Sequence, residues 1–295
     1  MAVLAVESLS KNYGHIKALK GISFTVPKGT VFGVLGPNGS GKTTLLGIVM
    51  DVLKPTAGSF KIFDEVPAGD SRKKIGTLLE TPNFYHYLSG EKNLRIAASI
   101  KGRGEDDIDR VLNVVNLFHR KDSKFSTYSL GMKQRLAIAS ALLGDPDVLV
   151  LDEPTNGLDP VGIAEIRELI KSLHRSGKTI IMASHLLDEV EKVCTHVAIL
   201  KKGDLVTHGN VEEIFVHNDL VDVEAEDLET LRNVLSAFPG LVELKETAKG
   251  FIASFPPGLT DLATINKHCF NNGVVLSKLN LNKRSLESKF FELTN

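Results

Sequence analysis

A glycine-rich run near the N-terminus ends in a lysine and two threonines, residue types that together can bind phosphate. The run reads Gly36-Pro37-Asn38-Gly39-Ser40-Gly41-Lys42-Thr43, and Thr44 follows it. It fits the pattern GxxxxGK followed by Ser or Thr, whose glycines let the backbone wrap so that its N–H groups point at phosphate oxygens. We expect Lys42 to reach the β- and γ-phosphates of a nucleotide and the Thr43 hydroxyl to bind Mg²⁺. Thr44 would offer a hydroxyl or N–H to the α-phosphate.

The segments on either side of this loop are those that a phosphate-binding loop needs. Val31–Leu35 is a short apolar run that predicts a buried strand. Thr43–Asp51 predicts a helix, whose positive N-terminal end adds to the phosphate site. GTPases, kinases and helicases share this strand, loop and helix, so other motifs must decide between these P-loop NTPases.

The composition argues against several functional classes. The chain has 295 residues, 42% of them hydrophobic, and a formal net charge of -1, so we expect a normal core and no nucleic-acid partner. No apolar run approaches the roughly 18–20 residues that cross a bilayer, and the N-terminus lacks the basic start of a signal peptide. Cys194 and Cys269 stand far apart, outside any CxxC pattern, which is typical of reduced thiols. These features favour a cytoplasmic protein.

Alternating strand and helix patterns predict an α/β fold. Val148–Leu151 reads as a buried strand that ends at an acidic pair, Val161–His174 as a helix, and Thr179–Ala183 as another buried strand. This alternation implies a largely parallel sheet covered by helices. Residues from about 83 to 144 read as mainly helical, so we predict a helical insert there.

The pattern changes near the end of the first 215 residues. Residues 216–295 alternate short strands with helices and suffice for a small α+β domain. We therefore predict a nucleotide-binding domain over residues 1–215 and a C-terminal accessory α+β domain over residues 216–295.

Further motifs follow the phosphate loop in a fixed order. They read Tyr128-Ser129-Leu130-Gly131-Met132-Lys133-Gln134-Arg135, then Val148-Leu149-Val150-Leu151-Asp152-Glu153, then Pro154-Thr155-Asn156-Gly157-Leu158-Asp159-Pro160, and finally Ser184-His185. In order and spacing, these motifs resemble the ATP-binding cassette of ABC transporters from Val3 to about Phe215. The resemblance implies a P-loop NTPase fold that binds ATP and Mg²⁺.

The resemblance also assigns expected roles to single residues. Asp152 would hold Mg²⁺, and Glu153 would polarise the attacking water as general base. His185 would touch the γ-phosphate and orient Glu153. Tyr13 stands where the family stacks an aromatic ring on adenine, and Asp159 lies in the loop that the family places at a dimer seam.

The segment from Tyr128 to Arg135 occupies the place of the family signature, usually LSGGQ. Ser129 and Gly131 are retained, whereas Leu130 replaces a glycine and Met132 replaces the glutamine. At the start of a helix, the serine and the following amides form an anion site. In the family this site binds the γ-phosphate held by a second cassette, so the resemblance implies a head-to-tail dimer, here expected to be a homodimer.

A second departure from the family pattern lies in the segment from Ile75 to Tyr85, which aligns with the Q-loop. Glu80 stands where most cassettes have glutamine, and its carboxylate is an expected Mg²⁺ ligand. The signature and Glu80 both resemble the ATPases of bacitracin-export and lantibiotic-immunity transporters. The aromatic residues Phe84, Tyr85 and Tyr87 follow, where the resemblance places the cytoplasmic helix of the membrane subunit.

The expected function is ATP hydrolysis coupled to export of a peptide antibiotic, drug or lipid-like cargo through a separate integral membrane subunit. The chain would then lie on the inner face of the cell membrane. Two alternatives stay open: a soluble ATP-driven switch, and a module that senses nucleotide without hydrolysing it. The single cassette without sustained heptads disfavours the first, and the presence of Lys42, Glu153 and His185 disfavours the second.

Overall fold

The computed structural model describes residues 1–67, 69–79, 83–214, 219–256 and 260–282. Its contacts divide the chain into two compact units, Met1–Val211 and Glu212–Asn295. The first unit carries all of the nucleotide-binding motifs found in the sequence. Within the described residues, no helix combines the length and apolar character that a membrane crossing requires.

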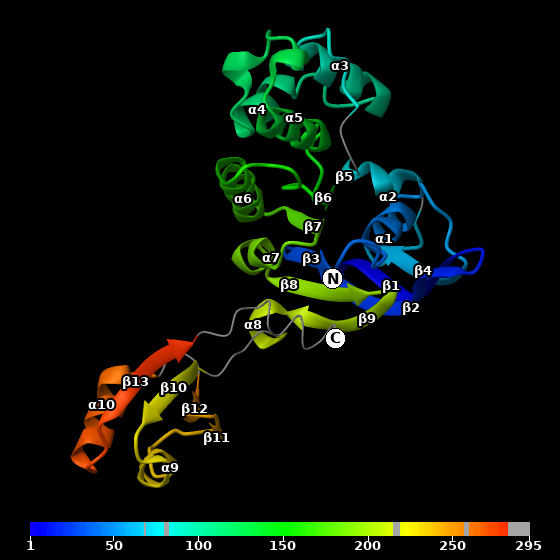
Figure 1. Ribbon diagram of the computed structural model, residues 1–295. Coiled ribbons are helices and arrows are strands. Elements are labelled where there is room, and N and C mark those ends of the chain that lie inside the picture. The colour runs from blue at the N-terminus through cyan, green and yellow to red at the C-terminus, as the bar shows by residue number, and fades with distance from the viewer. Residues whose placement is uncertain (68, 80–82, 215–218, 257–259, 283–295) are drawn as a thin grey trace. The chain divides into compact units, whose positions relative to one another are not determined.

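A six-stranded sheet forms the centre of the first unit (Figure 1). In spatial order its strands are β5 (Ile75–Leu78), β6 (Val148–Asp152), β7 (Thr179–Ser184), β3 (Val31–Leu35), β8 (His196–Lys201) and β9 (Asp204–Asn210). All neighbours are parallel except β9, which pairs antiparallel with β8. Every residue of β3, β6 and β7 is buried, as expected for parallel strands covered on both faces. The α/β class predicted from the sequence is confirmed.

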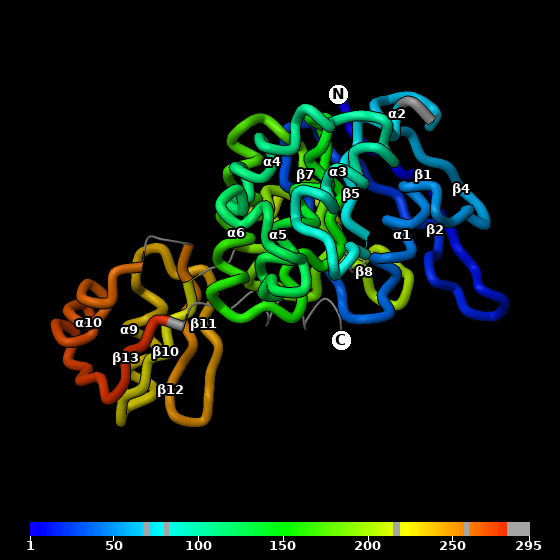
Figure 2. Tube along the Cα trace, turned by 90° about the horizontal axis from the view of Figure 1, so that it is seen from above, coloured from blue at the N-terminus to red at the C-terminus, as the bar shows by residue number. Residues whose placement is uncertain are grey.

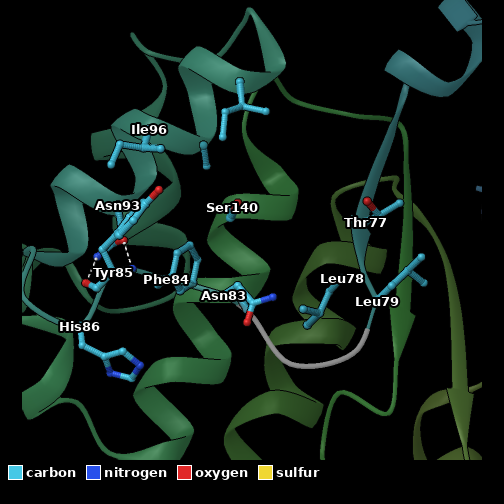
Figure 3. Close-up of a pocket in the computed structure, with 13 residues that line it drawn as sticks. Thr77, Leu78, Leu79, Asn83, Phe84, Tyr85, His86, Asn93, Ile96 and Ser140 are labelled. Atoms are coloured by element: carbon cyan, nitrogen blue, oxygen red, sulfur yellow. Dashed lines mark hydrogen bonds between the residues drawn. The ribbon is translucent and has the colours of Figure 1, made fainter. Parts of the chain in front are cut away.

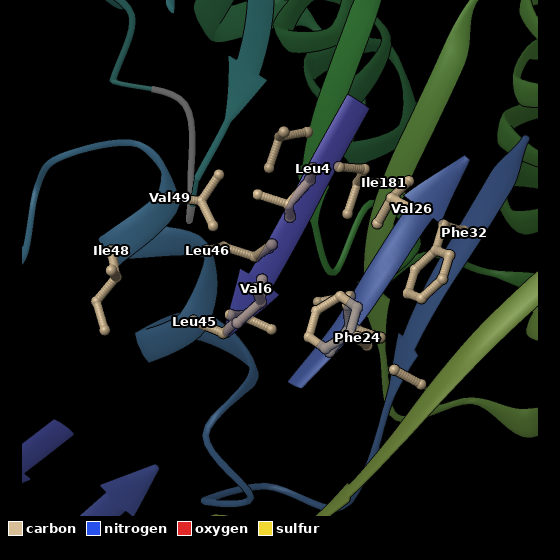
Figure 4. Packing of buried hydrophobic residues seen from close by; sticks show 14 of the residues in the cluster. Leu4, Val6, Phe24, Val26, Phe32, Leu45, Leu46, Ile48, Val49 and Ile181 are labelled. Carbon is tan, nitrogen blue, oxygen red and sulfur yellow. The ribbon is translucent and has the colours of Figure 1, made fainter. Parts of the chain in front are cut away.

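A second sheet of three antiparallel strands was not anticipated from the sequence. It comprises β2 (Ile16–Pro27), β1 (Ala2–Tyr13) and β4 (Ala57–Ile62), in that order. One face of this sheet packs with α1 (Lys42–Val49) on the main sheet (Figure 4). Phe24 of β2 stacks on Phe32 of β3 with ring centroids 5.5 Å apart, a pairing worth about 1 kcal/mol beyond its burial. This core fixes the start of α1, and therefore the phosphate loop, against the sheet.

The helical insert forms a group of its own in Figure 1. It contains α3 (Gly90–Lys101), α4 (Ile108–Val114), α5 (Leu130–Leu142) and two short 3₁₀ helices, Phe118–Arg120 and Phe125–Thr127. The mainly helical insert predicted from the sequence is interrupted between its helices, and α4 ends at Val114. Asn116 adopts a left-handed backbone conformation with φ of 53°, which a continuing helix does not allow.

The opposite face of the main sheet is covered by α6 (Pro160–Arg175) and α7 (Leu187–Val193). In Figures 1 and 2, α1 and α6 lie on opposite sides of the central strands. Asp159 caps the N-terminus of α6, and Pro160 follows it at the first helical position. Ile166, Ile170 and Leu173 form the buried stripe of this amphipathic helix. The short helix α2 (Gly69–Lys73) precedes β5, and α8 (Val211–Ile214) lies where the first unit ends.

The second unit has the element order β10 (Asp219–Ala225), α9 (Leu228–Ser236), β11 (Glu243–Glu246), β12 (Gly250–Phe255), α10 (Leu262–Asn271) and β13 (Leu276–Asn282). Its four strands are antiparallel in the order β11-β12-β10-β13. This order is the ferredoxin-like arrangement. Asp227 and Asp261 cap its two helices, and a separate core of its own residues packs between helices and sheet.

Candidate nucleotide site

The phosphate-binding loop connects the end of β3 to the start of α1, in a conformation that requires glycine. Gly41 has φ of +108°, and a Cβ added there would lie 2.5 Å from the carbonyl oxygen of Ala18. No other residue type fits at that position without moving the backbone. Lys42 is 6% exposed, and its Nζ donates hydrogen bonds to the carbonyl oxygens of Gly36 at 2.8 Å and Pro37 at 3.3 Å. The ammonium group is therefore folded back over the loop.

The acidic pair lies at the carboxyl end of β6. Asp152 is the last residue of this strand and is 5% exposed. Glu153 adopts a left-handed backbone conformation with φ of 46°, which costs a non-glycine residue about 1–3 kcal/mol. Its N–H donates to the carbonyl oxygen of Ala183 on β7 at 3.0 Å. The strained turn thus redirects Glu153 from the strand toward the neighbouring strand end.

Both carboxylate oxygens of Glu153 have cationic or polar partners. Lys42 Nζ lies 3.3 Å from Oε1, and His185 Nδ1 lies 2.8 Å from Oε2. A carboxylate only accepts hydrogen bonds, so His185 donates from Nδ1. The structure therefore brings together three predicted catalytic residues, from the start of α1 and from the ends of β6 and β7. This is the edge of a parallel sheet at which ligands bind in open α/β folds.

The donors expected to hold Mg²⁺ suit that ion. The Thr43 hydroxyl is on an exposed residue at the start of α1, and the Asp152 carboxylate is at the end of β6. In the described part of the chain, no group of three or more His, Cys, Asp or Glu residues could hold a metal by itself. A few oxygen ligands completed by water and substrate phosphates are the usual environment of Mg²⁺. Glu80 lies outside the described residues, so its proposed ligand role stays a prediction.

Tyr13 lies at the end of β1 and is 45% exposed. Lys11 Nζ is 5.1 Å from the centroid of its ring, a cation–π contact that restrains the ring. The exposed aromatic surface is compatible with stacking on a base.

The signature segment lies in the helical insert, at the start of α5. Ser129 is the N-cap of this helix, and its Oγ accepts from the N–H of Met132 at 3.2 Å. A Cβ added at Gly131 would meet nothing within 4 Å, so the helix start is open to a ligand. From the sequence, Leu130 is only a leucine in place of a signature glycine. In the structure its exposed side chain lies beside the loop that follows Glu153, because a Cβ added at Gly157 would be 3.5 Å from Leu130 Cδ2.

Asp159 has a structural role within its own chain. Its Oδ1 accepts from the N–H of Gly162 at 2.8 Å, which caps α6. The carboxylate thereby fixes the loop between Glu153 and α6. A role at a dimer seam stays a prediction.

A cavity of about 590 Å³ opens between β5 and the helical insert (Figure 3). The aromatic residues that the resemblance places beside the membrane subunit differ in how far they are packed. Phe84 lines the cavity and also packs edge-on against Phe125 of the insert, with ring centroids 5.2 Å apart. Tyr85 and Tyr87 are 50% and 69% exposed, and their ring centroids lie 5.8 Å apart. Of these two, Tyr85 lines the cavity.

Comparison with known proteins identifies the family. A family model described as "ABC transporter" matches residues 19–156. The chain is 34% identical to the bacitracin transport ATP-binding protein BcrA of Enterococcus faecalis, across 99% of this chain and 96% of that protein. The chain belongs to the ABC transporter family. The cassette is also 37% identical to the lantibiotic transport ATP-binding protein SrtF of Streptococcus pyogenes, across 72% of this chain and 96% of that protein.

Solved structures agree with this membership. The cassette matches cbiO1 from Clostridium perfringens, described as part of the ABC transporter complex cbiONQ, with 32% identity and a TM-score of 0.67. That match covers 81% of this chain and 96% of that one. A dimeric structure of the ATP-binding cassette MJ0796 bound to ADP and Pi matches with 26% identity and a TM-score of 0.62, covering 70% of this chain and 98% of that one. The resemblance to the bacitracin and lantibiotic type, stated from the sequence, is confirmed.

Proposed function

We propose that this cassette hydrolyses ATP and so powers export of a peptide antibiotic, drug or lipid-like cargo through a separate membrane subunit. The observation that carries the hydrolytic role is the Glu153 carboxylate held between Lys42 and His185 at the edge of the sheet. The cargo class rests on the relatives named for bacitracin and lantibiotic transport.

The proposed mechanism assigns one task to each of these side chains. The loop amides and the start of α1 bind the phosphate groups, and the Lys42 ammonium attracts the β- and γ-phosphates. Glu153 orients the attacking water and takes its proton. Nδ1 of His185 donates to the Glu153 carboxylate, and Nε2 would donate to the γ-phosphate when the ring carries both protons.

Thr43 and Asp152 are the described residues proposed to hold Mg²⁺. When bound, this ion neutralises charge that develops on the phosphate oxygens. Glu80 is a further proposed ligand. Lys42 and Thr43, which are adjacent on α1, would thus act on the same phosphate groups, one directly and one through the metal ion.

A second copy of the cassette is the proposed partner for hydrolysis. The serine that caps α5 lies on the helical insert, whereas the phosphate loop lies at the start of α1 on the main sheet. Head-to-tail pairing would bring Ser129 of one copy to the nucleotide of the other. The dimeric MJ0796 structure with ADP and Pi supports this arrangement by analogy.

Phosphate release by the purified chain tests the proposal. We expect Mg²⁺-dependent release that is absent in Lys42→Ala. Binding of ATP without release would favour a nucleotide-sensing module instead. Co-purification with a tagged membrane subunit in detergent tests the coupling, because a soluble ATP-driven switch would hydrolyse ATP yet recover no such subunit.

The cargo is tested in cells. A bacitracin-sensitive bacterium that expresses the cassette with its membrane subunit should tolerate more bacitracin than one that expresses the Glu153→Gln variant. Equal sensitivity of the two strains to bacitracin and to a lantibiotic would contradict the peptide-antibiotic assignment.

A further inference from the structure

An ion pair joins the two helices that cover one face of the main sheet. Arg167 on α6 donates from Nε to Oε2 of Glu189 on α7 at 3.0 Å, and from Nη2 to Oε1 at 2.6 Å. This is the two-pronged geometry in which a guanidinium fixes both the position and the direction of a carboxylate. Only 6% of Glu189 is exposed, and the Arg167 side chain is 22% exposed.

Each of these helices begins at a part of the proposed hydrolysis site. The α6 helix starts directly after Asp159, in the loop that follows Glu153. The α7 helix starts two residues after His185, whose Nδ1 holds Glu153. Glu189 is the third residue of α7, four positions after His185, which precedes the helix. Arg167 lies about 12 Å along α6 from the cap residue, at 1.5 Å per residue.

The α7 helix is held by tertiary contacts rather than by its own length. It buries Leu187, Val190 and Val193 against the main sheet, and the ion pair adds a polar contact with a fixed direction. The helix has seven residues, and its N-cap residue, Leu186, makes no side-chain capping hydrogen bond. Helices this short are marginal without tertiary contacts. The pair with Arg167 anchors its first turn to the sixteen-residue α6, which is capped and amphipathic. Figure 1 shows the two helices on the same side of the strands.

We infer that Arg167 and Glu189 are a positioning pair that fixes His185 against Glu153. The pair makes the placement of His185 depend on α6, and thereby on the loop that contains Asp159. This inference rests on the proposed hydrolytic function. Arg167 acts through Glu189 and α7 rather than by contact with the nucleotide. A pair that only stabilises the packing of two helices is the alternative that the experiment must exclude.

The test measures nucleotide binding, turnover and the state of His185 separately. Arg167→Gln and Glu189→Gln each remove the ion pair. Arg167→Gln leaves the buried Glu189 carboxylate without its partner, whereas Glu189→Gln leaves the partly exposed Arg167 guanidinium, which water can still reach. Lys178→Gln is the matched control. Lys178 is also largely buried and pairs with Asp145 at 2.8 Å, but it precedes β7, at the end of the sheet opposite the site.

We expect kcat for ATP hydrolysis to fall about 10-fold in both pair variants, because a misplacement of about 1 Å in a catalytic group costs up to ~10²-fold. The dissociation constant for ATP should stay within about 2-fold, since the phosphate loop is intact. Arg167→Lys keeps the charge and loses the planar fork, so it should recover part of kcat. Lys178→Gln should leave kcat unchanged, even if it lowers the melting temperature as much as the pair variants do.

Two further readouts separate positioning from stability. The first is the ¹⁵N-histidine NMR spectrum. The chain has nine histidines, and the spectrum of His185→Ala identifies the His185 signal. The Nδ1 resonance of His185 should shift in the two pair variants and not in Lys178→Gln. In a His185→Ala background, Arg167→Gln should lower kcat by less than about 2-fold, because the group that it positions is already absent.

An unmoved His185 resonance, a full additional loss in the His185→Ala background, or an equal loss in Lys178→Gln would each overturn the positioning role. Failure of the proposed function gives a different pattern, in which the wild-type chain releases no phosphate. If the wild type turns over normally and His185→Ala lowers kcat but the pair variants do not, the positioning role is rejected and the proposed function stands.

Discussion

At the scale of single residues, the site depends on how Glu153 is held. Its carboxylate has Lys42 on one oxygen and His185 on the other, and its backbone has a positive φ. A carboxylate with a partner on each oxygen, on a strained turn, has few alternative positions. The strain is therefore part of what points this carboxylate at the strand ends.

Glu153→Gln should bind ATP and hydrolyse it at least ~10²-fold more slowly, because an amide cannot accept the proton of the attacking water. The ATP-bound dimer should accumulate, which size-exclusion chromatography with Mg-ATP would detect. Glu168→Gln, at an exposed carboxylate on α6, is the control and should hydrolyse normally. Near-normal turnover of Glu153→Gln would remove this residue from the role of general base.

Lys101 gives the stability of the cassette a distinct pH dependence. Burial and the neighbouring charge of Arg103 lower the pKa of Lys101 to about 8, from an ordinary value near ~10.4. Between these two values the unfolded chain binds a proton that the folded chain has released. The contribution of Lys101 to the free energy of unfolding therefore rises with pH across this window and is flat below about pH 8.

Lys101→Met should remove this rise, so the unfolding free energy of the variant should increase less than that of the wild type between pH 8 and 10. Urea unfolding at a series of pH values measures the difference. Lys171→Met on α6, where the lysine is 37% exposed, is the control and should follow the wild-type curve. Parallel curves for wild type and Lys101→Met would show that Lys101 titrates normally.

At the scale of elements, the segment after β5 is joined to the helical insert by backbone hydrogen bonds. Phe125 N–H donates to the carbonyl oxygen of Leu88 at 2.8 Å, and Ser126 N–H donates to that of His86 at 3.0 Å. Three residues later Ser129 caps α5. If the segment that carries Tyr85 and Tyr87 moved, these hydrogen bonds would transmit the movement to Ser129 over only a few residues.

Tyr85→Ala combined with Tyr87→Ala should weaken assembly with the membrane subunit while ATP binding survives. The two rings are exposed and contact each other, as aromatic anchors at interfaces do. Phe118→Ala, at a partly exposed ring on a 3₁₀ helix of the insert, is the control. Pull-down of the membrane subunit measures assembly, and unchanged recovery by the double variant would reject the docking role of these rings.

At the scale of the whole molecule, each of the two units has a hydrophobic core made of its own described residues. One joins the two sheets and α1 of the first unit, and the other lies wholly between the helices and the four-stranded sheet of the second. Separate cores are what independently folding domains have. All described residues of the proposed nucleotide site lie in the first unit.

A chain that ends near His217 should therefore still bind Mg-ATP with an affinity close to that of the full chain. Fluorescence titration with a labelled nucleotide measures binding, and a cooperative thermal transition shows that the shortened chain is folded. Lys42→Ala in the same shortened chain serves as the control without binding. Loss of binding by a demonstrably folded shortened chain would show that the accessory unit is needed for the site.

The sequence alone determined those features that depend on contiguous residues. The phosphate loop could be predicted because its glycines, Lys42 and Thr43 act through local backbone geometry. The strands that precede Gly36 and Asp152 could be predicted because every residue in them is apolar. Likewise, Ser129 could be placed at a helix start, since capping is a local hydrogen bond.

Only the tertiary structure decided which distant segments meet. The 2.8 Å contact of His185 with Glu153 joins residues 32 positions apart, and β1 pairs with β4 across more than one intervening element. The sequence pattern of a strand does not show which strand it pairs with, so the three-stranded sheet could not be predicted from the sequence. Arg167 and Glu189 read as ordinary charges on amphipathic helices. Their pairing follows from how α6 and α7 pack on a shared sheet, because burial of one carboxylate is set by contacts between elements rather than by its neighbours in the chain.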